Sequence, residues 1–152
     1  MKKGDKAIDF TLKNSEGNDV TLSNVTKEGK VLLLFFPLAY TGVCTDEMCT
    51  MRDNMKLYNS LNASVFAISV DSFFTLKEFK KANNLNFTLL SDFNKEISKA
   101  YDVLYQDFFG MKGVSKRSAF IINDQMDIEY AEVLEDAGNL PDFKSIQSVL
   151  KQ

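Results

Sequence analysis

Two kinds of hydrophobic pattern alternate along the chain. Unbroken apolar runs are typical of strands buried on both faces, and they predict strands over Val31–Phe36, Val65–Val70 and Ala119–Ile122. Apolar residues at spacings of three and four are typical of helices that bury one face. This second pattern predicts helices over Thr45–Leu61, Ser72–Asn83, Glu96–Tyr101 and Asp142–Lys151. Ser72 is a suitable N-cap, and Pro141 is suited to the start of the last helix.

Shorter apolar segments predict the remaining strands. They cover Asp9–Lys13, Asp19–Leu22, Phe87–Leu90 and Ile128–Leu134. Turn residues at Asn14–Gly17 and near Gln125 predict a hairpin towards each end of the chain, with a βαβ unit between the hairpins. This order is typical of an α/β fold with a central mixed sheet and helices on its faces. A length of 152 residues fits a single domain over 1–152.

Candidate chemistry follows the first buried strand. In sheets of this kind, active sites collect beyond the carboxyl ends of the central strands. Pro37, Thr41 and Cys44 come directly after Val31–Phe36, at the start of the following helix. Cys44 and Cys49 are the only cysteines of the chain. We therefore expect Cys44 to be either a buried, inert thiol or a nucleophile.

Composition limits the class of protein, its compartment and the groups available for catalysis. A net charge of −3 argues against a nucleic-acid binder, which relies on a basic excess. The N-terminal lysines are not followed by the apolar segment of a secretory signal, and the longest apolar run is about half the length of a membrane span. We therefore expect no membrane association and a cytoplasmic protein, in which thiols stay reduced. The chain has no histidine, which excludes Cys–His dyads and imidazole metal ligands.

A thiolate at Cys44 needs stabilisation from groups other than imidazole. The positive end of the helix supplies part of it, and the Thr41 hydroxyl is near enough in sequence to point at the sulfur. Pro37 stiffens the entry to the loop. Two carboxylates, those of Asp46 and Glu47, oppose a thiolate. The candidate cation that offsets them is Arg117, at the mouth of the strand Ala119–Ile122.

These residues resemble the active-site signature of the peroxiredoxins. The pattern Pro-x-x-x-Thr-x-x-Cys follows the apolar run LLLFF, and GDKAIDFTL, SVDS and KRSAFIIN resemble further segments of that family. The resemblance implies a thioredoxin-like fold with an N-terminal hairpin and a thiol-dependent peroxidase activity. By position, Cys44 matches the peroxidatic cysteine, Pro37 and Thr41 the loop residues, and Arg117 the family's arginine. Glu47 matches an acidic residue that holds this arginine in place.

The implied reaction needs no metal, flavin or haem. The Cys44 thiolate attacks the O–O bond of hydrogen peroxide or an organic hydroperoxide, which yields water or an alcohol and a sulfenic acid. Arg117, the Thr41 hydroxyl and the N–H groups of Val43 and Cys44 would stabilise the charge on the leaving oxygen. The resemblance is closest to the bacterioferritin-comigratory (Q) type and to the one-cysteine E type. Ile8 departs from the family, which usually has a proline there.

Cys49 follows Cys44 by five residues, as the resolving cysteine often does in Q-type peroxiredoxins. In a helix, this spacing separates the two Cα atoms by roughly 8.6 Å, whereas a disulfide needs about 4.4–6.8 Å. We therefore expect the disulfide to form only if the first helical turns unwind, with thioredoxin or a similar dithiol as the reductant. Alternatively, Cys49 packs beside Met48 and Met51, and an external thiol resolves Cys44.

Other possibilities remain open from the sequence. A thioredoxin-like disulfide exchanger needs Cys-x-x-Cys, which the chain lacks. A peroxide sensor without turnover would use the same cysteines. No cysteine lies near the C-terminus, so the intersubunit disulfide of typical two-cysteine peroxiredoxins is excluded, and both a monomer and a homodimer are possible. Phe108, Phe109 and Met111 are expected to fill the core, with a dimer face or a pocket rim as the alternative.

Overall fold

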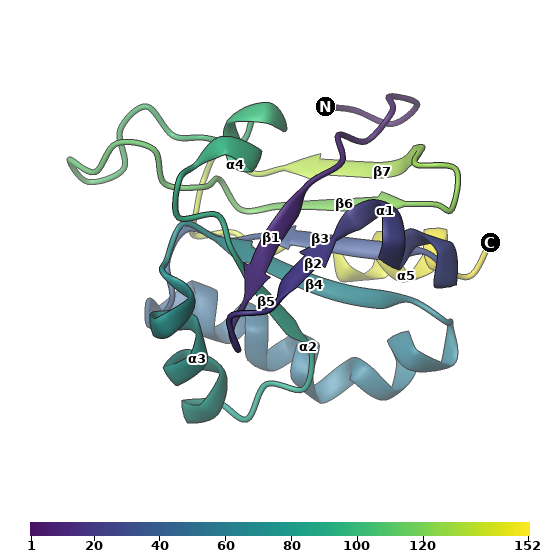
Figure 1. Cartoon of the computed structure of the whole chain (residues 1–152), viewed down its shortest axis with the longest axis horizontal. Coiled ribbons are helices and arrows are strands. Elements are labelled where there is room, and N and C mark those ends of the chain that lie inside the picture. The colour runs from purple at the N-terminus through teal and green to yellow at the C-terminus, as the bar shows by residue number, and fades with distance from the viewer.

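A seven-stranded mixed sheet forms the centre of the computed structural model, which describes residues 1–152 (Figure 1). Its strands are β1 (Thr11–Asn14), β2 (Asp19–Thr21), β3 (Val31–Phe35), β4 (Ser64–Ser69), β5 (Thr88–Ser91), β6 (Ser118–Ile122) and β7 (Ile128–Val133). They are ordered β2-β1-β5-β4-β3-β6-β7. The central strands β3, β4 and β5 are parallel, and the flanking pairs are antiparallel.

Helices cover both faces of this sheet. They are α1 (Leu22–Val25), α2 (Gly42–Ser60), α3 (Phe73–Ala82), α4 (Glu96–Ala100) and α5 (Phe143–Leu150), with a 3₁₀ turn, η1, at Thr26–Glu28. One apolar cluster joins the sheet to α2, α3 and α5, and the other joins it to α1 and the end of α4. None of the helices combines the length and the apolar character that a membrane span requires.

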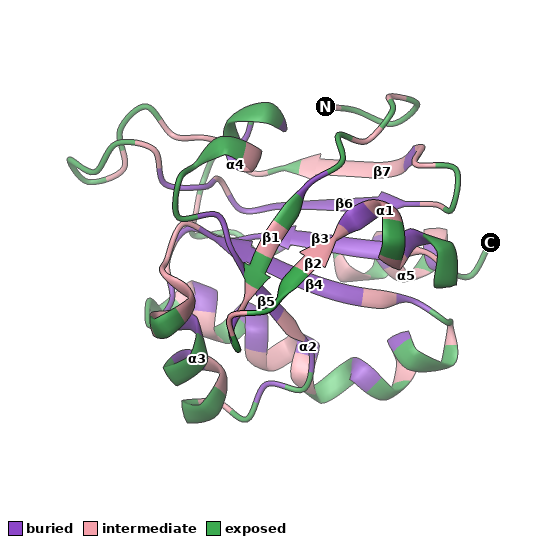
Figure 2. Ribbon diagram, in the orientation of Figure 1, coloured by how far each residue is buried: buried purple, intermediate pink, exposed green.

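The central strands are apolar throughout because each face of the sheet meets a different cluster. Along β3, Leu32 and Leu34 point into the cluster under α2, while Val31, Leu33 and Phe35 point into the cluster on the other face. Alternate side chains of a strand point to opposite faces, so every position of β3 is buried. Figure 2 shows this burial along β3, β4 and β6.

The expected fold class, a thioredoxin-like α/β fold with an N-terminal hairpin, is confirmed, with local differences. Helix α2 begins at Gly42, three residues before the predicted Thr45, since Thr41 is extended and serves as its N-cap. Leu22 was expected to end a strand but begins α1, which is too short to show a helical period. Ser72 caps α3 as predicted, with its Oγ accepting a hydrogen bond of 3.2 Å from the backbone N–H of Thr75.

Register brings the two halves of the candidate site together. Strand β6 is antiparallel to β3, and its first residue, Ser118, pairs with Phe35 at the end of β3. Arg117 therefore lies beside the carboxyl edge of β3, although it follows Cys44 by 73 residues. The start of α2, which follows β3 after a short loop, lies at the same edge.

Candidate active site

The loop between β3 and α2 is held in a defined shape. Tyr40 has a φ of 67°, which is a rare conformation for a bulky residue. The neighbouring backbone N–H of Ala39 donates to Oδ2 of Asp71 at 2.8 Å. The Ser69 hydroxyl donates to the same oxygen at 2.6 Å. Asp71 thus ties this loop to the end of β4.

Cys44 is the third residue of α2 and is almost fully buried. The first backbone bond recorded at the start of the helix runs from the N–H of Thr45 to the carbonyl of Thr41, at 2.9 Å. The N–H groups of the preceding residues therefore have no partner within the helix, and they carry its positive dipole end. Cys44 therefore lies in the turn of the helix where these N–H groups and the positive dipole end are found.

A buried arginine joins Cys44 to a buried glutamate. Arg117 Nη2 donates to Cys44 Sγ at 3.4 Å and to the carbonyl of Ala137 at 3.0 Å. Its Nη1 donates to Glu47 Oε1 at 2.7 Å. Cys44 and Glu47 are three residues apart in α2 and therefore lie on one face of the helix. One guanidinium thus contacts both acidic side chains.

The charges of these groups have identifiable causes. Burial raises the pKa of Glu47 to about 7, and the nearby charge of Arg117 opposes this rise. Burial of Arg117 works against its cation, but Glu47 and Cys44 outweigh it and raise its pKa, so that it stays protonated. Asp46 is exposed and makes no contact with Arg117. The two carboxylates that the sequence placed near Cys44 are thus accounted for, because Glu47 pairs with Arg117 and Asp46 is exposed to solvent.

The thiol lies in a cavity of about 590 Å³. Pro37, Thr41, Cys44 and Arg117 all line it, whereas Glu47 lies behind the arginine and does not. Aromatic side chains form another part of the lining, namely Tyr105, Phe108 and Phe109. Four of the predicted site residues thus share one concave space, with the glutamate supporting it from the interior.

Two expectations about this cavity were wrong. Thr41 does not point its hydroxyl at the sulfur, because the hydroxyl donates to the carbonyl of Leu38 at 2.9 Å in the turn that closes the loop. The Phe108–Met111 segment does not fill the core. It forms a tight hairpin that projects outward, and the side chain of Phe109 is 89% exposed. The alternative of a pocket rim describes Phe108 and Phe109 correctly.

Cys49 lies outside this cavity. It is half-buried on α2, and its sulfur is 3.9 Å from Asn83 Oδ1, at the end of α3. Both cysteines are free thiols, and α2 is continuous through both of them. No group of three or more Cys, Asp or Glu side chains is arranged to hold a metal ion.

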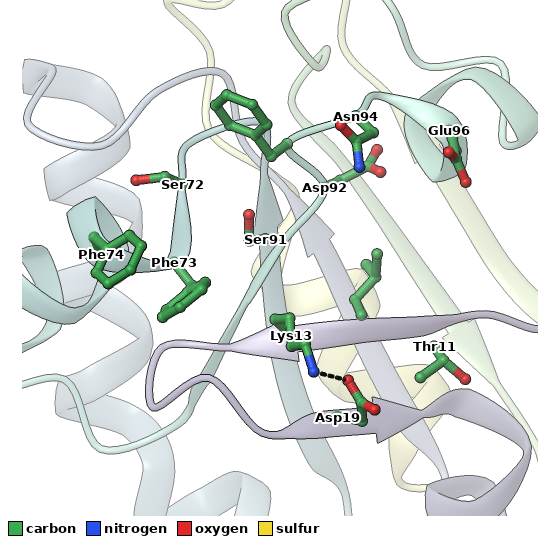
Figure 3. A pocket seen from close by; sticks show the side chains of 12 residues that line it. Thr11, Lys13, Asp19, Ser72, Phe73, Phe74, Ser91, Asp92, Asn94 and Glu96 are labelled. Atoms are coloured by element: carbon green, nitrogen blue, oxygen red, sulfur yellow. Dashed lines mark ion pairs between the residues drawn. The ribbon is translucent and has the colours of Figure 1, made fainter.

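A second cavity, of about 500 Å³, lies between the β1–β2 hairpin, the start of α3 and the segment after β5 (Figure 3). Its lining includes Phe73 and Phe74 and the ion pair between Lys13 and Asp19, at 2.7 Å. It holds no thiol, and its lysine is already paired. The cavity at Cys44 is therefore the one that combines a nucleophile with a cation.

Comparisons with known proteins identify the family. Residues 3–131 match the AhpC/TSA family. The chain belongs to the AhpC/TSA peroxiredoxin family. It is 35% identical over 135 residues to alkyl hydroperoxide reductase E of Mycobacterium tuberculosis strain H37Rv, which covers 88% of this chain and 86% of the relative. It is 39% identical over 126 residues to the putative peroxiredoxin bcp of Buchnera aphidicola subsp. Schizaphis graminum, which covers 81% of this chain and 78% of the relative.

Solved structures agree with this family. Peroxidoxin BcpB from Mycobacterium tuberculosis has a TM-score of 0.89 at 28% identity, over 99% of this chain and 97% of that chain. A cysteine-to-serine mutant of Xylella fastidiosa PrxQ has a TM-score of 0.87 at 25% identity, over 99% of this chain and 96% of that chain. The relatives thus include proteins named for both of the expected subgroups. The protein is a peroxidase of the oxidoreductase class.

Some groups of this peroxiredoxin site could not be singled out beforehand. Asp71 lies in the SVDS segment, whose resemblance to the family was noted, but its bond to the loop depends on the fold. The carbonyl of Ala137 contacts Arg117 from the segment after β7, where the sequence has no motif. Tyr105 lines the cavity from a region without a periodic pattern. Their common feature is that they act through the backbone or through long-range contacts.

The buried Glu47 of this peroxiredoxin predicts a specific pH dependence of stability. Its pKa rises from 4.5 to about 7 on folding, so the folded state keeps a proton that the unfolded state releases between these values. Stability should therefore fall as the pH rises through this window, by on the order of 2–3 kcal/mol. Because the chain has no histidine, few other groups titrate there.

Urea denaturation at about pH 5 and about pH 7.5, on either side of most of this window, measures the effect. The variant Glu47→Gln cannot ionise but keeps an acceptor for Arg117, and its free energy of unfolding should vary less between the two conditions. The prediction is wrong if the wild type and Glu47→Gln lose the same stability as the pH rises.

Proposed function

We propose that this peroxiredoxin reduces hydrogen peroxide and organic hydroperoxides with Cys44 as the peroxidatic cysteine. The thiolate sulfur bonds to one peroxide oxygen, the O–O bond breaks, and the leaving hydroxide or alkoxide takes up a proton. The products are Cys44 sulfenic acid and water or an alcohol. The observation that carries this proposal is the contact of 3.4 Å between Arg117 Nη2 and Cys44 Sγ inside the cavity.

The surrounding groups would stabilise the transition state. Negative charge grows on the leaving oxygen, and preorganised donors in a closed site are effective at stabilising such charge. The guanidinium of Arg117 and the N–H groups of Val43 and Cys44 are the available donors at the start of α2. The Thr41 hydroxyl uses its proton on Leu38, so its oxygen is free to accept the O–H of the peroxide. Pro37 lines the same space and limits the movement of the loop.

The aromatic lining supports organic hydroperoxides as substrates. Tyr105 and Phe108 both line the cavity and stack with their ring centroids 5.0 Å apart. An alkyl group would bury apolar surface against these rings, while its peroxide group reaches Cys44. Hydrogen peroxide would use only the polar end.

We infer that Cys49 resolves the sulfenic acid as an intramolecular disulfide, which thioredoxin or a similar dithiol then reduces. The spacing of the only two cysteines on one helix supports this step. The one-cysteine alternative has its own support, since Cys49 lies outside the cavity against Asn83. A peroxide sensor would form the same disulfide but would not turn over. The proposed enzyme acts as a single domain over 1–152 in the cytoplasm, where dithiol reductants keep both thiols reduced.

Steady-state turnover with thioredoxin and thioredoxin reductase tests the proposal. The wild type should consume many equivalents of peroxide per protein, and Cys44→Ser should consume none. Cys49→Ser should lose thioredoxin-dependent turnover while one equivalent of peroxide still reacts. Retained turnover in Cys49→Ser would instead show the one-cysteine cycle, and consumption of one equivalent by the wild type would show a sensor.

A further inference from the structure

A polar cluster surrounds Cys49 where α2 meets the end of α3. The Cys49 sulfur lies 3.9 Å from Asn83 Oδ1. Arg52, one helical turn after Cys49, donates from Nη1 to the backbone carbonyl of Asn83 at 2.7 Å. The side chain of Asn86 donates to the backbone carbonyl of Arg52 at 3.3 Å. The thiol and the guanidinium are therefore both held by Asn83.

The cluster also couples Cys49 electrostatically to Arg52. The two residues are three positions apart in α2, so their side chains are neighbours on the helix surface. The hydrogen bond with Asp53 raises the pKa of Arg52 most, and the charge of a Cys49 thiolate raises it further. Arg52 therefore stays protonated and places a positive charge one helical turn from Cys49. Charged side chains close by in the two helices include Asp53, which pairs with Arg52 at 2.9 Å, and Lys80 and Lys81 in the last turn of α3.

We propose that Arg52 is a positioning residue for the resolving step: it anchors the Cys49 segment of α2 to the end of α3 and places a guanidinium beside the sulfur that attacks Cys44 sulfenic acid. This inference rests on the proposed role of Cys49. In the step, the Cys49 thiolate sulfur bonds to the Cys44 sulfur, the S–O bond of the sulfenic acid breaks, and the departing hydroxide takes up a proton to become water. In this proposal, Arg117 acts on Cys44 and Arg52 acts on Cys49.

The two arginines differ in where they are anchored. Arg117 immediately precedes β6 and contacts Cys44 directly, at 3.4 Å. Arg52 is on the same helix as Cys49, and its bonds to Asn83 and Asn86 fix that part of α2 to the end of α3. Arg52 therefore gives this part of α2 a fixed anchor on the C-terminal side of Cys49.

Single-turnover kinetics separate this role from the first step. Arg52→Met removes the charge and keeps a good helix former, Arg52→Lys keeps the charge, and Lys56→Met removes an exposed cation one turn further along α2. After one equivalent of peroxide, acid-quenched samples analysed by mass spectrometry give the rates of sulfenic acid and of disulfide formation. Sulfenic acid formation should be the same in all four proteins.

Disulfide formation should be about tenfold slower in Arg52→Met, because the attacking sulfur loses its neighbouring cation. Its pH profile should move to higher pH, which a purely structural defect would not cause. Arg52→Lys should retain most of the rate, and Lys56→Met all of it. If Arg52→Met forms the disulfide at the wild-type rate and with the wild-type pH profile, the proposed role of Arg52 is wrong, while the role of Cys49 is unaffected. Absence of the Cys44–Cys49 disulfide in the wild type would overturn the resolving role of Cys49 as well, while leaving the reaction at Cys44 intact.

Discussion

Replacing Arg117 with methionine should slow the reaction of Cys44 with peroxide by about 10²–10³-fold, the usual effect of losing a donor that stabilises transition-state charge. The guanidinium contacts the sulfur at 3.4 Å, and the chain has no histidine that could take its place. Both the thiolate and the charge on the leaving oxygen lose their cation. Stopped-flow measurement of sulfenic acid formation in a Cys49→Ser background isolates this step.

The same substitution leaves the carboxyl group of Glu47 buried without its partner, at a cost of about 1–3 kcal/mol in stability for the unpaired polar group. The double variant Glu47→Leu/Arg117→Met replaces both members of the pair with apolar side chains, so no unpaired polar group remains. It should recover stability, as measured by urea denaturation, without recovering the rate. The rate at which Cys44 reacts in Arg117→Lys should lie between the rates of the wild type and Arg117→Met. Lysine keeps the positive charge but lacks the planar guanidinium that contacts both Cys44 and Glu47. A wild-type rate in the double variant would show that the arginine only supports the fold.

Oxidation should unwind the start of α2. In the reduced structure, both cysteines lie in one continuous helix of 19 residues, from Gly42 to Ser60. Helical geometry puts Cα atoms five positions apart at roughly 8.6 Å, beyond the range of about 4.4–6.8 Å for a disulfide. Forming the bond must therefore disrupt roughly the first two turns. Far-ultraviolet circular dichroism of the reduced and oxidised forms should show this loss of helix.

Cys49→Ser provides the control for this experiment. Treated with the same equivalent of peroxide, it should keep its helical signal because no internal disulfide can form. Equal helicity of the reduced and oxidised wild type, with the disulfide verified, would contradict the unwinding.

The general fold was predictable because burial leaves a direct pattern in the sequence. Strand β3 is apolar at every position since a cluster of side chains meets each of its faces. Helix α2 buries Met48, Met51 and Met55 at helical spacing, so its existence was clear although its first residue was not. Helix α1 was missed because four residues are too few to show a period.

The residues that the structure brings together at the candidate site were predictable, but their hydrogen bonds were not. The position of Cys44 followed from the rule that active sites lie beyond the carboxyl ends of parallel strands, and the family motif supported Arg117. The direction of the Thr41 hydroxyl depends on the geometry of the loop, which residue types alone do not specify. The outward hairpin at Phe108–Met111 was missed because aromatic residues without a period resemble core residues.

The most direct test is the mass of the reduced protein after one equivalent of hydrogen peroxide, with proteolysis to locate the change. The account predicts that Cys49→Ser gains one oxygen at Cys44 and that the wild type loses two hydrogens through a bond between Cys44 and Cys49. An unmodified Cys44 in both proteins, or an oxygen found first at Cys49, would contradict the central claim that Cys44 beside Arg117 is the group that attacks peroxide.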